Sequence, residues 1–112
     1  MKDGNPFPAS AIARYFHLTN IFIPNAAASK EYIVPYGLSS TDNFYNKHYT
    51  KLNSQSKRIA VNGESKKAYI AIIQIYYKTI ELCEYHEDGN AKERAKEELE
   101  ITIKNKEVLF PE

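Results

Sequence analysis

Residues 65–85 read SKKAYIAIIQIYYKTIELCEY, and the fold class depends on whether these residues form a helix or a strand. Apolar side chains recur in it at alternating steps of four and three residues, at Tyr69, Ile73, Tyr76, Ile80 and Cys83. This is the spacing of a helix that packs along another helix. Ser65, at the start of the stretch, can cap the first turn of the helix, because its hydroxyl accepts a hydrogen bond from a free backbone N–H. We therefore predict a helix over residues 65–87.

The same stretch also supports an alternative in which it is a β-strand. Asn62 and Gly63 form a strong two-residue hairpin signal, and the run YIAIIQIYY is rich in β-branched and aromatic residues. The helix is favoured because the four-three pattern continues for about twenty residues without a breaker. The alternative fold is α+β, with a hairpin that turns at Asn62 and Gly63.

A second helix is predicted downstream, over residues 91–106. Gly89 is expected to supply the left-handed position that ends the first helix, and Asn90 to cap the second. Ala91, Ala95, Leu99 and Ile103 then form a narrow stripe on a helix that is otherwise charged. The short connection requires the two helices to pack as an antiparallel hairpin. Val108, Leu109 and Phe110 are expected to fold back onto the bundle.

Upstream, residues 40–60 are predicted to form a third helix. Ser39 and Asp42 resemble a capping box. Apolar or small residues then follow at helical spacing, at Tyr45, Tyr49, Leu52, Ser56 and Ile59. Pro8 can open a helix of about ten residues that stops before Pro24.

The expected fold class is mainly α. It is a small helical bundle with a C-terminal antiparallel helical hairpin and an irregular N-terminal third. Residues 1–112 are expected to form a single domain. Residues 1–38 hold an arm, the short helix and a connector, and residues 39–112 the helical body. The connector, residues 20–38, is left open between an edge strand near residues 32–34, an arm and a swapped segment.

Composition excludes several classes of protein. The 112 residues are 43% hydrophobic and 26% charged, which is typical of a globular domain. The single cysteine cannot form an internal disulfide. The N-terminus MKDGNPFPAS lacks the apolar segment of a signal peptide, and no apolar run is long enough to span a bilayer. We expect a cytoplasmic protein without a membrane contact.

The residues that could carry chemistry are few. Cys83 and His86 lie one helical turn apart, but a cysteine in an apolar seam is usually inert. With Glu87 they would supply too few ligands for zinc, and the other histidines have no ligand-like neighbours. The sequence contains no phosphate-binding loop, metalloprotease motif or nucleophile elbow. We expect no enzymatic activity, no metal and no cofactor.

Charge is divided along the chain, and this favours a second hypothesis, nucleic-acid binding. Residues 1–80 carry an excess of Lys and Arg, whereas residues 81–112 carry an excess of Asp and Glu. Tyrosines are interleaved with basic residues over residues 43–78, as in surfaces that bind phosphates and stack bases. The candidate nucleic-acid-binding residues are Lys47, Lys51, Lys57, Arg58, Lys66 and Lys67.

The order of a Tyr/Lys helix, Val61, Asn62 and Gly63, then lysines and a long aliphatic helix resembles the small terminase subunits of tailed phages. This resemblance covers fewer than half of the residues and rests on no specific motif. It implies a nucleic-acid-binding protein of phage or mobile-element type.

The first hypothesis is a non-enzymatic protein-interaction module that self-associates and binds a protein partner. The helix at residues 65–87 is apolar on more than one face, which needs more covering surface than a short chain readily provides. Tyrosine is also enriched at interfaces. The candidate partner-binding residues are Tyr69, Tyr76, Tyr77, Ile73 and Ile80.

Overall fold

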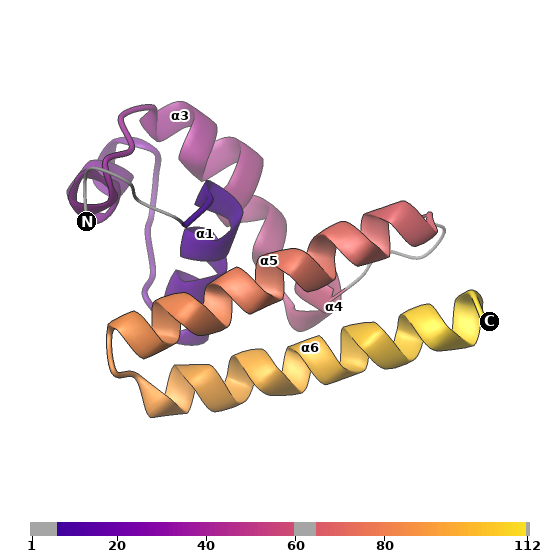
Figure 1. The fold of residues 1–112 in the computed structure, drawn as a ribbon. Coiled ribbons are helices and arrows are strands. Elements are labelled where there is room, and N and C mark those ends of the chain that lie inside the picture. Colours follow the sequence, from indigo (N-terminus) through magenta and orange to yellow (C-terminus); the bar gives the residue numbers. More distant parts are fainter. Residues whose placement is uncertain (1–6, 60–64, 112) are drawn as a thin grey trace.

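A computed structural model of the chain describes residues 7–59 and 65–111, and every regular element in these ranges is helical (Figure 1). The prediction of a mainly α fold is confirmed. The three long helices are α1 (Ala9–Leu18), α5 (Lys66–Tyr85) and α6 (Gly89–Leu109). The short elements are η1 (Ala27–Ser29), α2 (Lys30–Ile33), η2 (Val34–Tyr36), α3 (Thr41–Asn43), η3 (Phe44–Tyr49), η4 (Thr50–Leu52) and α4 (Gln55–Ile59).

The two longest helices, α5 and α6, form a hairpin in which they lie side by side and antiparallel (Figure 1). α5 starts where its cap predicts, because the Ser65 hydroxyl accepts a hydrogen bond from the Ala68 N–H at 3.2 Å. The α+β alternative is wrong, because the residues that would have formed the second strand of its hairpin form α5. Asn62 and Gly63 themselves lie outside the described residues.

The left-handed residue in the turn between α5 and α6 lies two positions before the predicted one. Glu87, not Gly89, takes the left-handed position, with φ of 55°. The Asp88 N–H then donates to the Cys83 carbonyl at 2.9 Å, and the Glu87 N–H to the Glu84 carbonyl at 3.0 Å. These two bonds satisfy carbonyls that the end of α5 would otherwise leave free.

The cap of α6 is Asp88, not Asn90. Its carboxylate accepts a hydrogen bond from the Ala91 N–H at 3.0 Å. Both residue types cap helices well. Asp88 also accepts a hydrogen bond from the Tyr15 hydroxyl at 3.1 Å, and this long-range contact ties the turn to α1.

Residues 41–59 form an interrupted helix rather than the single one predicted. The cap is Ser40, not Ser39, and it accepts a hydrogen bond from the Asn43 N–H at 3.3 Å. A π-helical turn, η3, places Phe44 and Tyr49 five residues apart on the same buried side. The extra residue per turn shifts the register that the four-three pattern assumes.

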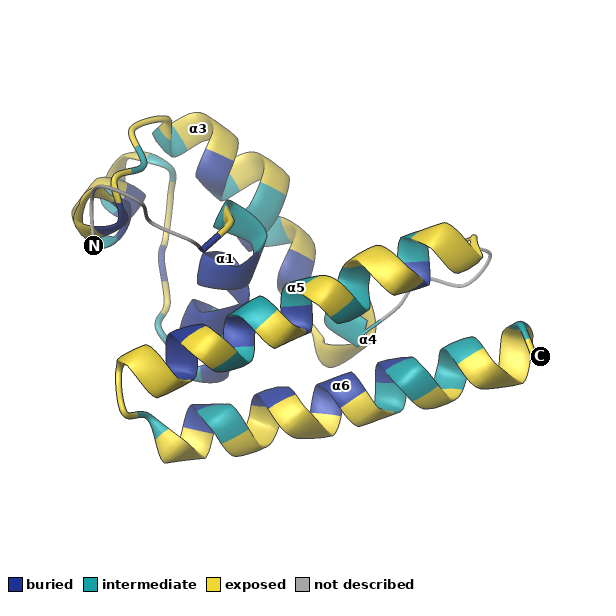
Figure 2. Cartoon of the chain, viewed as in Figure 1, coloured by how far each residue is buried: buried dark blue, intermediate teal, exposed yellow. Residues whose placement is uncertain are grey.

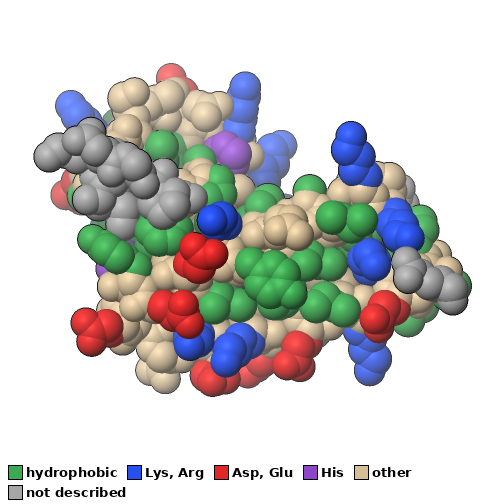
Figure 3. All heavy atoms as spheres, viewed as in Figure 1, with side chains coloured by type: hydrophobic (Ala, Val, Ile, Leu, Met, Phe, Trp, Pro, Cys, Tyr) green, Lys and Arg blue, Asp and Glu red, His purple; other side chains and the backbone are tan. Residues whose placement is uncertain are grey.

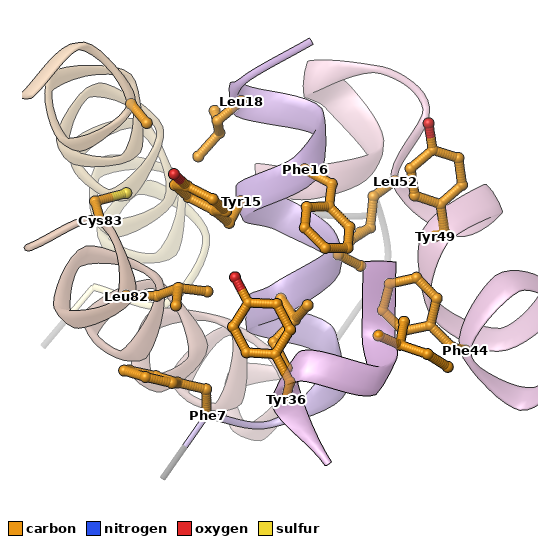
Figure 4. Close-up of a cluster of buried hydrophobic side chains, with 14 of the residues drawn as sticks. Phe7, Tyr15, Phe16, Leu18, Tyr36, Phe44, Tyr49, Leu52, Leu82 and Cys83 are labelled. Carbon is orange, nitrogen blue, oxygen red and sulfur yellow. The ribbon is translucent and has the colours of Figure 1, made fainter. Parts of the chain in front are cut away.

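α1 is the centre of the core and has the predicted length. Most of its residues are buried, whereas α5 and α6 alternate between buried and exposed positions (Figure 2). The Phe16 ring makes edge contacts with Tyr32, Tyr36 and Phe44, with ring centroids 5.8, 6.2 and 5.9 Å away. Side chains from α1, η2, η3 and α5 converge in this cluster (Figure 4).

The connector at residues 20–38 packs on its own chain as short helical turns, so an edge strand near residues 32–34 is wrong. The Tyr49 hydroxyl donates to the Ile21 carbonyl at 2.8 Å and accepts from the Ile23 N–H at 3.0 Å. The Tyr45 hydroxyl donates to the Pro24 carbonyl at 2.9 Å. Two tyrosines from one helical segment therefore hold the connector in place.

The C-terminal apolar residues do not fold back as predicted. α6 runs on to Leu109, so Val108 and Leu109 are 72% and 52% exposed. Phe110 alone of the three packs inward, with its ring 5.9 Å from that of Tyr69. In the part of the chain that the structure describes, no helix is long and apolar enough to cross a bilayer.

Candidate interaction surface

α5 has a buried face and an exposed face, and the structure divides the predicted partner-binding residues between them. Tyr69 and Tyr76 are 1% and 0% exposed and belong to the chain's own interior. Ile73 and Ile80 are half-buried. Tyr77 is 48% exposed, and Ile70 on the same side is 43% exposed. The surface open to a partner is therefore narrower than the sequence indicates.

A buried polar network explains why Tyr76 points inward. Its hydroxyl donates to Glu98 at 2.8 Å, and the Arg14 guanidinium lies over its ring, 5.1 Å from the centroid. Glu98 in turn accepts two close hydrogen bonds from the Arg58 guanidinium, at 3.0 and 2.8 Å. The network links α1, α4, α5 and α6 through a hydroxyl and three charges.

This network was not predicted from the sequence, although the sequence contains one signal for it. Glu98 and Thr102 lie at helical spacing from Ala91 and Ala95, and all four side chains are buried. Arg14 stands between buried apolar residues of α1 and is 3% exposed. A charged residue inside an apolar helical stripe indicates a buried ion pair, because an unpaired buried charge is very costly.

The exposed side of the hairpin carries an apolar strip bordered by charged side chains of both signs (Figure 3). Ile70 and Tyr77 are seven residues apart on α5 and so lie on one helical face. The hairpin is long in comparison with the body, and the molecule measures 43 × 27 × 25 Å. This leaves much of the outer side of α5 uncovered by the rest of the described chain (Figure 2).

The predicted nucleic-acid-binding residues lie on two separate segments of the chain, η3–α4 and the start of α5, and do not share one role. Lys47, Lys51 and Lys57 are exposed on the η3–α4 segment. Lys66 and Lys67 are exposed at the start of α5. Arg58 is different, because the described hydrogen bonds of its guanidinium go to Glu98 and to the Leu52 carbonyl. Its side chain is 13% exposed, and its guanidinium is already engaged by these partners within the chain.

Cys83 is fully buried, and burial raises the pKa of its thiol to about 11. A thiol with this pKa is protonated at neutral pH and is a poor nucleophile. His86 does not act on it, since its Nε2 shares a 2.6 Å hydrogen bond with the Tyr36 hydroxyl. Its ring also stacks on Tyr15, with centroids 4.9 Å apart. Within residues 7–59 and 65–111, no group of three or more His, Cys, Asp or Glu side chains could hold a metal.

Two shallow hollows, of about 370 and 250 Å³, adjoin each other near the C-terminal end of α1. His17, Asn20, Gln55 and Arg58 line both of them. Burial lowers the pKa of His17, although its hydrogen bond to the Tyr49 carbonyl acts in the opposite direction. The ring donates this bond through Nε2 at 2.7 Å and stacks on Tyr49. The histidine is used to join α1 to η3.

We expect the protein to become less stable as the pH falls below about 6.5, the ordinary pKa of an unfolded histidine. The folded pKa of His17 lies below that value, so the unfolded chain binds more protons in this range. The stability that neutral His17 contributes is complete above the unfolded pKa and is lost below it. Thermal unfolding at about pH 7.5 and 5.5 should show a lower Tm at the lower pH.

The control for this prediction is His17→Gln, whose amide can still donate to a carbonyl. The variant should show a smaller pH dependence than the wild type. The remaining dependence would come from His48 and His86, whose pKa values burial also lowers. A Tm that rises towards low pH would contradict the prediction.

Comparison with known proteins adds no identification, because no family model, no curated protein and no solved structure matches this chain.

Proposed function

We propose that this chain is a non-enzymatic helical interaction module that self-associates through the outer face of α5. The observation that carries the proposal is the exposure of Ile70 and Tyr77, 43% and 48%, on one face of a long helix. Large aromatic and aliphatic side chains grouped on a surface are typical of protein interfaces. Val108 and Leu109, exposed at the end of α6, offer a separate apolar site for a protein partner.

Tyr77→Glu is expected to weaken self-association at least about tenfold, because it places a charge on the exposed apolar strip of α5. Sedimentation equilibrium over micromolar concentrations measures the dissociation constant. Val34→Glu is the matched control, since Val34 is 55% exposed but lies on the η2 turn. It should leave the dissociation constant unchanged. A wild-type protein that stays monomeric at about 100 µM would reject the proposal.

Nucleic-acid binding remains a second candidate, favoured by the exposure of Lys47, Lys51, Lys57 and Lys67. Lys and Arg side chains project from the same side of the molecule near η3–α4 and near the start of α5 (Figure 3). A mobility-shift experiment with duplex and single-stranded DNA at low salt tests this candidate. Binding should weaken steeply with added salt. No shift at low salt would remove it.

A further inference from the structure

The outer face of α5 is self-complementary, and this points to a specific partner for it, a second copy of the same helix. The face contains a row of residues at steps of four, three, four and three, all of them exposed except Lys78, which is half-buried: Lys67, Ala71, Gln74, Lys78 and Glu81. Ile70 and Tyr77 lie along one edge of this row. At a rise of 1.5 Å per residue the row is about 21 Å long.

The charges on this face are arranged against the dipole of the helix. The first turn of α5 carries lysines and no acidic residue, and its last five residues include Glu81 and Glu84 and no basic residue. Cations near a helix N-terminus and anions near its C-terminus are both unfavourable for an isolated helix. An antiparallel helix with the same sequence presents opposite charge, and an opposite dipole, at each end.

The neighbouring helix α6 supplies only part of this compensation. At the turn, Lys92 pairs with Glu84 at 2.7 Å. Glu81 has a looser pair with Lys78, at 3.6 Å, and both side chains are about half-exposed. At the other end of the hairpin, α6 carries Lys104 and Lys106 together with Glu107. The exposed charges of Lys67 and Glu81 therefore remain available to another molecule.

We propose that two copies of the chain associate through α5, antiparallel, about a two-fold axis at Gln74. This rests on the proposed self-association and gives it a geometry. In this register Lys67 of each copy lies opposite Glu81 of the other, so the pairing occurs twice. Ile70 and Tyr77 lie on the same edge of the face, so Tyr77 of each copy lies beside Ile70 of the other. Gln74 meets Gln74, and an amide can both donate to and accept from a second amide.

Charge reversal tests the pairing. Lys67→Glu and Glu81→Lys each place like charges opposite one another twice, and each should raise the dissociation constant at least about tenfold. The double variant Lys67→Glu/Glu81→Lys restores opposite charges and should return to within about threefold of the wild type. Lys47→Glu, an exposed reversal on η3, is the control and should have no effect.

Cross-linking tests the register independently of charge. Helix axes that pack 8–10 Å apart bring residues on the two-fold axis within disulfide reach. Gln74→Cys should therefore form a disulfide-linked dimer under mild oxidation. Lys67→Cys should not, because its counterpart in the partner lies about 21 Å away along the helix. The native Cys83 is fully buried and should not interfere.

The outcomes separate this inference from the proposed function. If Tyr77→Glu weakens association but the double charge reversal is no better than either single one, the protein self-associates with another geometry. Efficient cross-linking of Lys67→Cys but not of Gln74→Cys would overturn the register in the same way. If the wild type is monomeric, both the geometry and the proposed function are wrong.

Discussion

Glu98→Ala should lower the free energy of unfolding by about 3–5 kcal/mol, the cost typical of removing one partner from a buried ion pair. Glu98 is 3% exposed and accepts hydrogen bonds from Arg58 and from the Tyr76 hydroxyl. Its loss leaves the Arg58 guanidinium, whose side chain is only 13% exposed, without its counter-ion and the buried Tyr76 hydroxyl without its acceptor. Arg14, which donates to the Arg58 carbonyl at 3.0 Å, then adds a second unbalanced charge nearby.

Urea denaturation followed by circular dichroism measures this loss. Glu97→Ala is a matched control on the preceding residue of α6, because that side chain is exposed and its removal should change stability by less than about 0.5 kcal/mol. Glu98→Gln keeps an acceptor for Tyr76 but removes the charge, so we expect an intermediate loss. Equal stabilities for Glu98→Ala and Glu97→Ala would show that the network does not stabilise the fold.

Phe16→Ala should cost about 3–5 kcal/mol through the cavity it leaves in the core. Phe16 is 3% exposed and contacts three aromatic rings, from α2, η2 and η3. Its removal loosens the connector from the body as well as α1 from its neighbours. In a domain whose total stability is typically about 5–15 kcal/mol, this is a large fraction.

The control for this substitution is Phe22→Ala, at a phenylalanine that is 77% exposed. It removes the same atoms from the surface and should change the free energy of unfolding by less than about 0.5 kcal/mol. The midpoint of urea denaturation distinguishes the two variants. Similar midpoints would mean that the aromatic cluster around α1 is not the core of the fold.

Local signals in the sequence were sufficient for the three long helices, α1, α5 and α6. The Ser65 cap, the extent of α1 and the α5–α6 hairpin all follow from spacing and capping within a few residues. The errors are local as well, where two chemically suitable residues compete. Asp88 and Asn90 can both cap a helix, and a contact with Tyr15, 73 residues away, accompanies the choice of Asp88.

The candidate surface was only partly predictable. Periodicity identified Tyr69, Tyr76 and Tyr77 together, because α5 is apolar on more than one side and period alone does not say which side faces the core. The structure buries Tyr69 and Tyr76 and leaves Tyr77 half-exposed. The basic residues show the same limit, since nothing near Arg58 in the sequence indicates that its partner is Glu98.

Sequence patterns alone predict a set of helices that ends in an antiparallel hairpin, because helical period and caps act over one or two turns. Which side of α5 is buried, which residue pairs with Arg58 and which residue caps α6 are fixed only by tertiary contacts. Those choices depend on contacts between residues 40 or more positions apart, such as Arg58 with Glu98 and Tyr36 with His86. Such contacts form only when the helices pack, so no local pattern specifies them.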